Sequence, residues 1–295
     1  MEIFGREESI KNNKKHIHND ISKFMSGKSY SDENFPVASF LMTKKIRKIV
    51  RIFYFFARMA DDVADHKTLT KHQKIKILKS FDNAILKNKQ SHNKVIQDMI
   101  LEFKGLPSGK KYSRNLLKAF LMDASNKKYI KWSDLLYYCK YSANPVGRFV
   151  IDAVKEKNNL EKIYEASDNL CTALQIINHM QDCKKDLEEL NRVYIPESLF
   201  KKYSINKSIL KKSRSMGNFE KLKVEIIENV LISLKTTKNG LSFIQSWRLR
   251  KETLIILNIA KRLCNLLKKK DPLKENIKLS RIELIFCFFK GIMYD

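Results

Sequence analysis

Glycine and proline, the residues that most often interrupt regular structure, are scarce. The chain of 295 residues holds 8 glycines and 5 prolines. Few turns are therefore forced, and long uninterrupted segments are expected. Alternating polar and apolar runs between turn signals are also scarce, which argues against a sheet. These shortages favour an all-α fold, in a chain long enough to bury a full hydrophobic core.

Cysteine pairs, a signal core and membrane-length apolar runs are missing as well. The 5 cysteines show no CxxC or Cys/His ligand spacing, which argues against a disulfide framework or a zinc site and favours a reducing compartment. Residues 1–15 contain no apolar signal core. No run approaches the roughly 18 apolar residues that a membrane-spanning helix needs. We therefore expect a cytoplasmic protein, with peripheral contact at the inner membrane face as its closest approach to lipid.

Acidic residues are few relative to basic ones. There are 58 lysines and arginines against 32 aspartates and glutamates, which gives a formal net charge of +26. The basic residues are scattered, with no compact arginine-rich tract, so solvated helix faces explain most of them. A nucleic-acid binder would interleave aromatic residues with a concentrated basic patch. Here the aromatic residues cluster on apolar helix faces, so we expect no nucleic-acid partner. Weak attraction to an anionic membrane surface follows in any case.

The pattern of apolar residues predicts roughly ten helices. Residues 1–30 form a polar lead segment, and residues 31–295 form one domain. Asn144 and Pro145 are expected as the N-cap and first residue of one helix. The last segment is short and very apolar; we expect it to dock into the core, with a membrane-facing helix as the alternative. The predicted helices cover residues 37–65, 70–87, 91–104, 112–124, 132–142, 160–190, 206–236, 240–269 and 280–293.

A narrow polar stripe runs along the otherwise apolar segment 49–66. At about 100° per residue, Tyr54, Arg58, Asp61 and Asp65 fall within about 60° of one another on a helix. A helix that is apolar nearly all round belongs in the interior of a protein. The sequence therefore predicts charged side chains in a buried place.

A second polar stripe runs along segment 171–190, which is also mostly apolar. Gln175, Asn178, Asp182 and Asp186 fall on one helix face by the same geometry. The alternative is that both stripes are solvated faces of surface helices. Their narrowness argues against it, and so does the repulsion between aspartates one turn apart, about 0.2–0.5 kcal/mol per pair. Burying such carboxylates costs several kcal/mol per ion unless they are paired. A cation would complete the arrangement, and Mg²⁺ typically joins a few carboxylates to substrate phosphates.

The two stripes resemble the aspartate-rich motifs of the squalene/phytoene synthase family. DDVAD at residues 61–65 is similar to the first motif, and QDCKKD at 181–186, followed by NRVYIP, is similar to the second. Tyr54 and Arg58 also stand where the family places a Tyr and an Arg. The resemblance covers roughly residues 30–290. It implies an isoprenoid-synthase-type helical bundle with a central cavity.

A finer resemblance points to the hydroxysqualene synthase branch. It is carried by ENFPVAS (33–39), KYIKWSDLLYYCKYSANPVGR (128–148) and ALQIINHMQD (173–182). That branch converts presqualene diphosphate and water to hydroxysqualene in hopanoid biosynthesis and needs no NADPH. Dehydrosqualene-type members carry Ser and Lys before the Phe that matches Phe35, and an Arg where this chain has Gln181. These departures fit an enzyme that receives presqualene diphosphate ready-made.

The resemblance implies roles for individual residues. Helix capping for Asn144 and a surface salt bridge for Arg148 stay open as alternatives to substrate contact. Asp123 matches a branch position but is a lone Asp, and His66 and His179 are expected to be structural. The implied Mg²⁺ ligands are Asp61, Asp62, Asp65, Asp182 and Asp186. The implied catalytic residues are Tyr54, Arg58 and Tyr138. The implied substrate-binding residues are Phe35, Ser39, Asn144, Arg148, Gln175, Asn178 and Arg192.

Two rival functions remain open from the sequence. One is another head-to-head synthase that makes squalene, presqualene diphosphate or phytoene from two allylic diphosphates. The other is a catalytically inactive relative that acts as an assembly or scaffold protein, although eroded aspartates would be expected there. A presqualene diphosphate synthase is an expected partner under the main hypothesis.

Overall fold

The structure is a computed structural model that describes residues 41–87 and 93–293. This part of the chain is helical and contains no strand, which confirms the all-α prediction. The predicted boundary between residues 30 and 31 lies outside the described residues. The α-helices are α2 (Lys44–Asp65), α3 (Lys71–Lys87), α4 (Lys94–Glu102), α5 (Pro107–Ala124), α6 (Trp132–Ser142), α7 (Asn144–Val154), α8 (Leu160–Gln181), α9 (Cys183–Leu190), α10 (Glu197–Lys202), α11 (Gly217–Leu241), α12 (Trp247–Lys269) and α13 (Arg281–Met293). Two short 3₁₀ helices, η3 (Phe103–Gly105) and η4 (Lys207–Lys211), join them.

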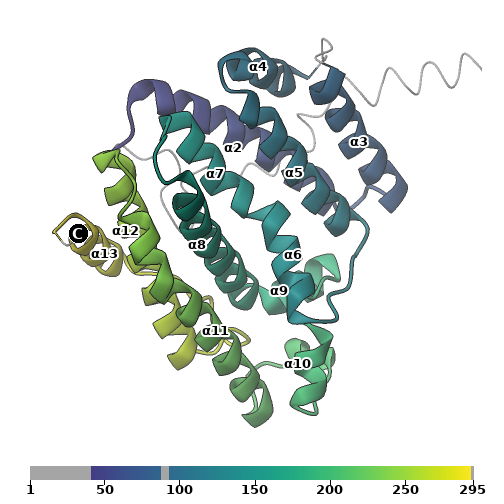
Figure 1. Cartoon of the computed structure of the whole chain (residues 1–295). Coiled ribbons are helices and arrows are strands. Elements are labelled where there is room, and N and C mark those ends of the chain that lie inside the picture. The colour runs from purple at the N-terminus through teal and green to yellow at the C-terminus, as the bar shows by residue number, and fades with distance from the viewer. Residues whose placement is uncertain (1–40, 88–92, 294–295) are drawn as a thin grey trace, which may run out of the picture.

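The helices form a bundle (Figure 1). Their buried apolar side chains make two hydrophobic clusters. The smaller cluster draws on α2 to α5 and includes Phe53 and Phe149, whose rings stack 4.0 Å apart. The larger cluster joins α6, α8, α11 and α12. Helix α8 packs against α6, α7, α11 and α12, so it lies at the centre of the bundle. The two predicted stripes therefore lie on helices from different clusters.

Several predicted helix boundaries were wrong. Helix α2 begins at Lys44, because the Thr43 hydroxyl accepts a hydrogen bond from the backbone N–H of Ile46 and caps the helix there. Helix α5 begins at Pro107 rather than at the predicted residue 112. The predicted helix 160–190 is two helices, since α8 ends at Gln181 and α9 begins at Cys183.

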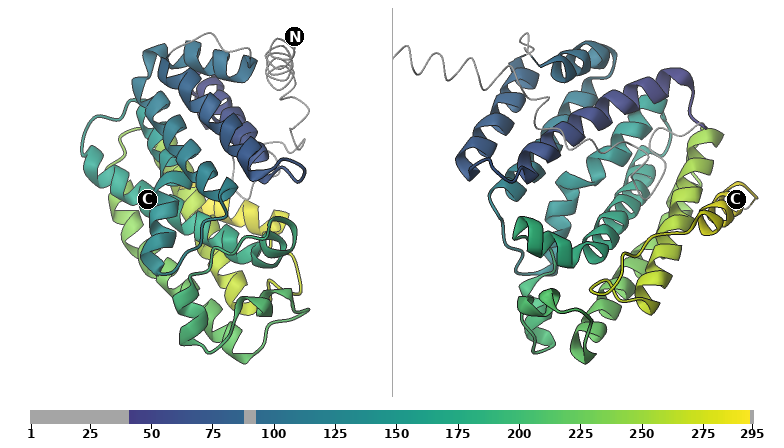
Figure 2. Two further views of the ribbon diagram at one scale, coloured as in Figure 1. Left: turned by 90° about the vertical axis from the view of Figure 1, so that its right-hand side faces the viewer. Right: turned by 180° about the vertical axis from the view of Figure 1, so that it is seen from behind.

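The last helix also differs from its prediction. Within α13 only Cys287 and Gly291 are buried, and the helix packs against α12 rather than inside the core. A close approach between backbones fixes this contact, because a Cβ on Gly291 would lie 2.7 Å from the backbone nitrogen of Ile255. Figure 2 shows α13 at the outer edge of the molecule. None of the helices described here is both long enough and apolar enough to cross a bilayer.

Candidate active site

A cavity of about 900 Å³ lies between the two clusters. One part of its wall is apolar and includes Val50 and Phe53 of α2, Leu170 of α8 and Ile256 of α12. Another part is polar and comes from the last turns of α2 and from the junction of α8 and α9. The volume is at the upper end of the range for small-molecule sites. The cavity can therefore take a long apolar ligand with one polar end.

The first stripe supplies the polar wall on the α2 side. Tyr54, Arg58, Asp61 and Asp65 all line the cavity. Arg58 donates to the Asp61 carboxylate over 2.9 Å and to that of Asp62 over 2.8 Å. Burial and the neighbouring carboxylate of Asp65 raise the pKa of Asp61 well above its ordinary value, against the opposing effect of Arg58. This side of the cavity therefore favours a positively charged group.

The second stripe supplies the opposite polar wall. Gln175, Asn178, Asp182 and Asp186 line the cavity as predicted. The break in the helix puts Asp182 at the N-cap of α9 and Asp186 in its first turn. The N-terminal end of a helix carries a partial positive charge that stabilises a carboxylate. The backbone thus contributes to holding these two charges.

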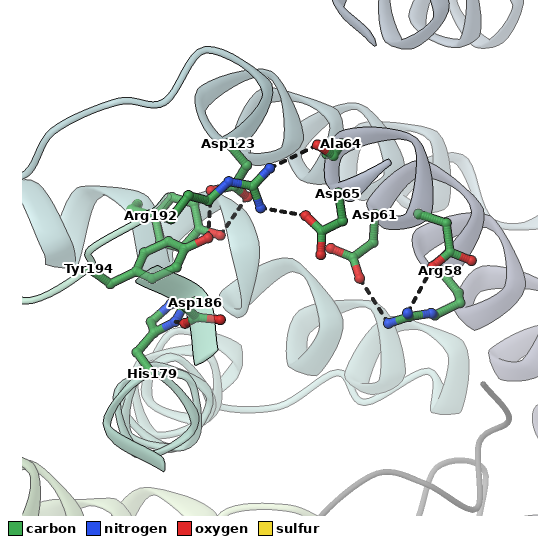
Figure 3. Close-up of polar contacts among 11 residues, drawn as sticks. Arg58, Asp61, Ala64, Asp65, Asp123, His179, Asp186, Arg192 and Tyr194 are labelled. Atoms are coloured by element: carbon green, nitrogen blue, oxygen red, sulfur yellow. Dashed lines mark hydrogen bonds and ion pairs between the residues drawn. The ribbon is translucent and has the colours of Figure 1, made fainter. Parts of the chain in front are cut away.

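Arg192 joins the two sides of the site (Figure 3). It follows α9, and its guanidinium donates to the Asp65 carboxylate and, over 2.8 Å, to the carbonyl of Ala64. The predicted substrate-binding residue is thus an ion-pair partner of a predicted metal ligand. Its contacts set the distance between the end of α2 and the segment after α9.

A buried hydrogen-bonded group lies behind the arginine. Asp123, which is 5% exposed, accepts hydrogen bonds from the hydroxyls of Tyr138 (2.7 Å) and Tyr194 (2.8 Å). Burial, followed by the charge of Asp123, raises the pKa of both tyrosines, so they remain neutral donors. Tyr138 lines the cavity, and its hydroxyl is committed to Asp123.

His179, which was predicted to be structural rather than a metal ligand, lines the cavity. Its ring stacks on Tyr194 with centroids 3.6 Å apart (Figure 3). The Gln175 amide nitrogen lies 3.1 Å from His179 Nε2. An amide nitrogen only donates, so Nε2 accepts and a neutral ring carries its proton on Nδ1. That atom lies 3.8 Å from the Asp186 carboxylate, so the ring faces a predicted ligand without a hydrogen bond to it.

The carboxylates fit a hard divalent cation as donors, although they do not form a finished cage. Within the described ranges, no three His, Cys, Asp or Glu side chains come close enough to hold an ion by themselves. Mg²⁺ commonly takes one or two protein carboxylates and fills its remaining positions with water and substrate phosphates. The all-oxygen donors and the raised pKa of Asp61 agree with such a partial site.

Two residues that were predicted to contact substrate make other bonds in the structure. Asn144 is not a helix cap; its side-chain oxygen accepts a 2.9 Å hydrogen bond from the hydroxyl of Thr172, which ties α7 to α8. Arg148 makes a bidentate ion pair with Asp168, at 2.9 and 2.7 Å. Neither residue belongs to the cavity wall, because these bonds turn both side chains toward α8. Phe35 and Ser39 lie outside the described residues.

Three residues of the cavity wall were not predicted from the sequence. Asp123 meets its tyrosines 15 and 71 positions away, so no local pattern marks it. Tyr194 lies in NRVYIP, beside the second motif, which was the available signal. Glu252 is 4% exposed and lines the cavity among apolar residues of α12. A lone Glu in a long helix offers no signal in the sequence.

Comparison with known proteins agrees with this geometry. The profile of the squalene/phytoene synthase family matches residues 29–283. A hydroxysqualene synthase of Zymomonas mobilis is 38% identical over 272 residues, which is 90% of this chain and 89% of that protein. A hydroxysqualene synthase of Rhodopseudomonas palustris is 34% identical and covers 91% of this chain and 90% of its own length.

Solved structures show the same fold. A dehydrosqualene synthase bound to a ligand superimposes with a TM-score of 0.79 at 18% identity, covering 95% of this chain and 98% of that one. The squalene synthase HpnC of Alicyclobacillus acidocaldarius gives a TM-score of 0.70 at 20% identity, covering 86% and 94%. The family profile and the relatives at 34–38% identity show that the chain belongs to the squalene/phytoene synthase family.

Proposed function

We propose that this protein is a hydroxysqualene synthase that converts presqualene diphosphate and water to hydroxysqualene and diphosphate. The observation that carries the proposal is an apolar cavity whose polar end is formed by both aspartate motifs. The close relatives support the choice of reaction, because hydroxysqualene synthases from three bacteria are 34–38% identical to this chain. The C30 chain of the substrate would occupy the apolar part of the cavity.

The carboxylates at the polar end would hold the diphosphate through Mg²⁺. Asp61 and Asp65 would bind from α2, and Asp182 and Asp186 from the α8–α9 junction, with Asp62 as an additional ligand. When bound, Mg²⁺ would act as a Lewis acid that stabilises negative charge on the departing diphosphate. Arg58 and Arg192 already lie beside these aspartates and have N–H groups that can turn to diphosphate oxygens.

Tyrosine residues of the cavity wall would stabilise the organic cation. The C–O bond to diphosphate breaks with its electron pair on the leaving oxygen, and the positive charge stays on the hydrocarbon. The Tyr138 hydroxyl is bound to Asp123, so this residue would offer its ring face to the cation, and Tyr54 would do the same from α2. Gln175 and Asn178 would orient the diphosphate or its ligands from the next turns of α8.

Water ends the reaction. Its oxygen bonds to the rearranged cation and loses a proton, so no electrons are needed from outside. The proposal therefore includes no NADPH. The apolar wall would restrict access by other water molecules until the rearrangement is complete.

The test is product identification. Purified protein is incubated with Mg²⁺ and presqualene diphosphate, without NADPH, and the lipid is identified by mass spectrometry. We expect hydroxysqualene from the wild type and from Asp98→Asn, an exposed aspartate on α4 that serves as a matched control. Asp61→Asn and Asp182→Asn should yield almost none.

Other outcomes would select a rival function. Condensation of farnesyl or geranylgeranyl diphosphate, without turnover of presqualene diphosphate, would assign a synthase of squalene, presqualene diphosphate or phytoene. No turnover of any diphosphate would favour the scaffold role. Under the main proposal the enzyme works in the cytoplasm and receives its substrate from a presqualene diphosphate synthase.

A further inference from the structure

Helix α13 carries its apolar residues on the side that faces away from the protein. Ile282, Phe286 and Met293 are 79%, 65% and 72% exposed, and Ile285 and Phe289 are also more than half exposed. At about 100° per residue these five side chains lie within a stripe of roughly 100°. Gly291, which packs on α12, lies on the opposite side. The usual orientation of a surface helix, apolar side inward, is therefore reversed.

The helix is held in this orientation by specific contacts. The Glu283 carboxylate accepts from the backbone N–H of Ser280 at 2.8 Å and pairs with Arg262 of α12 at 2.7 Å. Close packing of Gly291 on Ile255 holds the other end. The exposed stripe is consequently a fixed surface of the folded chain, and five adjoining large apolar side chains on a surface indicate an interaction site.

Positive charge borders the stripe. Arg281 and Lys290 are exposed and lie on either side of it around the helix. Burial, followed by the nearby charges of Lys290 and Lys238, lowers the pKa of Lys261, which indicates that these ammonium groups gather on this side of the molecule. The one acidic residue of α13, Glu283, is already bonded to Arg262 and Ser280.

We propose that the outward stripe of α13 docks on the surface of an anionic phospholipid membrane. Apolar side chains would enter the boundary between headgroups and acyl chains, and the flanking Arg281 and Lys290 would reach lipid phosphates. The net charge of the protein favours a membrane over a second copy of the chain as the partner of this stripe. A second copy carries the same net charge of +26 and would repel the first, whereas an anionic bilayer attracts it.

The position of α13 gives this contact a consequence for the active site. Helix α12 packs against both α13 and α8 (Figure 1). Its Thr253 and Ile256 line the cavity, and its Ile255 lies against Gly291. Membrane docking through α13 would bring this wall near the bilayer, where an apolar product can dissolve. That consequence rests on the proposed function, but the membrane binding itself does not.

Vesicle co-sedimentation of the full-length protein tests the proposal without any substrate. We expect binding to vesicles of phosphatidylcholine with phosphatidylglycerol, weaker binding to phosphatidylcholine alone, and weakening by salt. The variant Phe286→Ser/Phe289→Ser should bind at least about tenfold less tightly. Each aromatic side chain that is buried in lipid contributes more binding free energy than a tenfold change in affinity requires. Lys290→Glu should weaken binding several-fold on anionic vesicles only.

The matched control is Leu86→Ser/Leu101→Ser, which removes two exposed apolar side chains from α3 and α4, on another side of the bundle (Figure 1). It should bind like the wild type, and circular dichroism melts should confirm that all variants fold. Absence of vesicle binding, or equal binding by the α13 variant, would overturn the proposal. So would dimers in sedimentation that only the α13 variant loses, because the stripe would then serve a second copy.

Discussion

The two aspartate motifs hold their charges by different means. In α2 the helix continues through the motif, and Arg58 and Arg192 pair with its carboxylates. At α8–α9 the helix stops at Gln181 and restarts at Cys183. Asp186 there lies in the first turn of α9 and 3.8 Å from His179. The first motif is thus balanced by guanidinium groups, and the second by the end of a helix.

This difference suggests how the site changes when a ligand binds. The guanidinium groups that balance the α2 carboxylates are also the donors best suited to diphosphate. If a cation bound the aspartate carboxylates, these guanidinium groups could donate their hydrogen bonds to the substrate instead. The field at the start of α9 is fixed by the backbone and needs no exchange of partners. Substitutions at the two motifs should separate these two arrangements.

The largest expected effect is on catalysis. Asp61→Asn and Asp182→Asn should each lower kcat/KM by about 10²–10³-fold, the usual loss when one group that stabilises the transition state is removed. Asp62→Asn should cause a smaller loss, because Asp62 is buried against Arg58. Steady-state kinetics on presqualene diphosphate at saturating Mg²⁺ measures all three. An equal loss in the three variants would make Asp62 a full partner of the motif.

The next effect separates the two arginines by stability. Arg192→Met removes the bond between the end of α2 and the segment after α9, and it leaves buried Asp123 without a nearby cation. We expect a loss of about 2–3 kcal/mol, below the full cost of breaking a buried pair because Asp65 is partly exposed. The melting temperature should fall by roughly 5–10 °C. The ion pairs of Arg58 stay within one helix, so Arg58→Met should lower the free energy of unfolding by less. A larger loss in Arg58→Met than in Arg192→Met would contradict this expectation.

A third prediction concerns the break between α8 and α9. The Gln181 amide donates to the carbonyl of Ile277, a buried contact across 96 positions. Gln181→Leu would leave that carbonyl without its donor and should destabilise the fold by about 1–2 kcal/mol in urea unfolding. It should also raise KM for presqualene diphosphate, since the contact holds the chain next to Asp182. Unchanged kinetics would show that the junction is set by other contacts.

The smallest effect is a gain in stability. Asp61 lies among like charges, so Asp61→Asn should stabilise the metal-free protein by roughly 0.5–1 kcal/mol although it lowers turnover. Thermal melts with and without Mg²⁺ and inorganic diphosphate measure this difference. The wild type should gain more from the two ligands than the variant does. A variant less stable than the wild type without metal would show that the Arg58 pair outweighs the repulsion.

The sequence predicted what depends on local pattern. Helical spacing identified Tyr54, Arg58, Asp61 and Asp65 as one face, and all four line the cavity. The break at Asp182 was not predicted, because neither glycine nor proline marks it. The hydrogen-bond partner of the preceding Gln181, Ile277, is also distant in sequence. For the same reason Asp123 could not be identified before its tyrosines were located.

The outward orientation of α13 was also beyond the sequence. An apolar stripe predicts that one side of a helix is covered, but it does not say by what. Within the fold, Gly291 allows the opposite side to approach α12 closely, and this contact decides which side faces inward. The sequence did show that the segment is apolar enough to have two possible roles. The structure contradicts docking into the core, and membrane contact stays a proposal.

Under the proposed function, both motifs hold one diphosphate through a shared set of cations. Calorimetric titration of inorganic diphosphate into the wild type, Asp61→Asn, Asp182→Asn and the double variant tests it without any chemical step. We expect binding that requires Mg²⁺, a large loss in each single variant, and a double variant little worse than either, because the two residues act on one ligand. Binding without Mg²⁺, or losses that simply add, would contradict the claim.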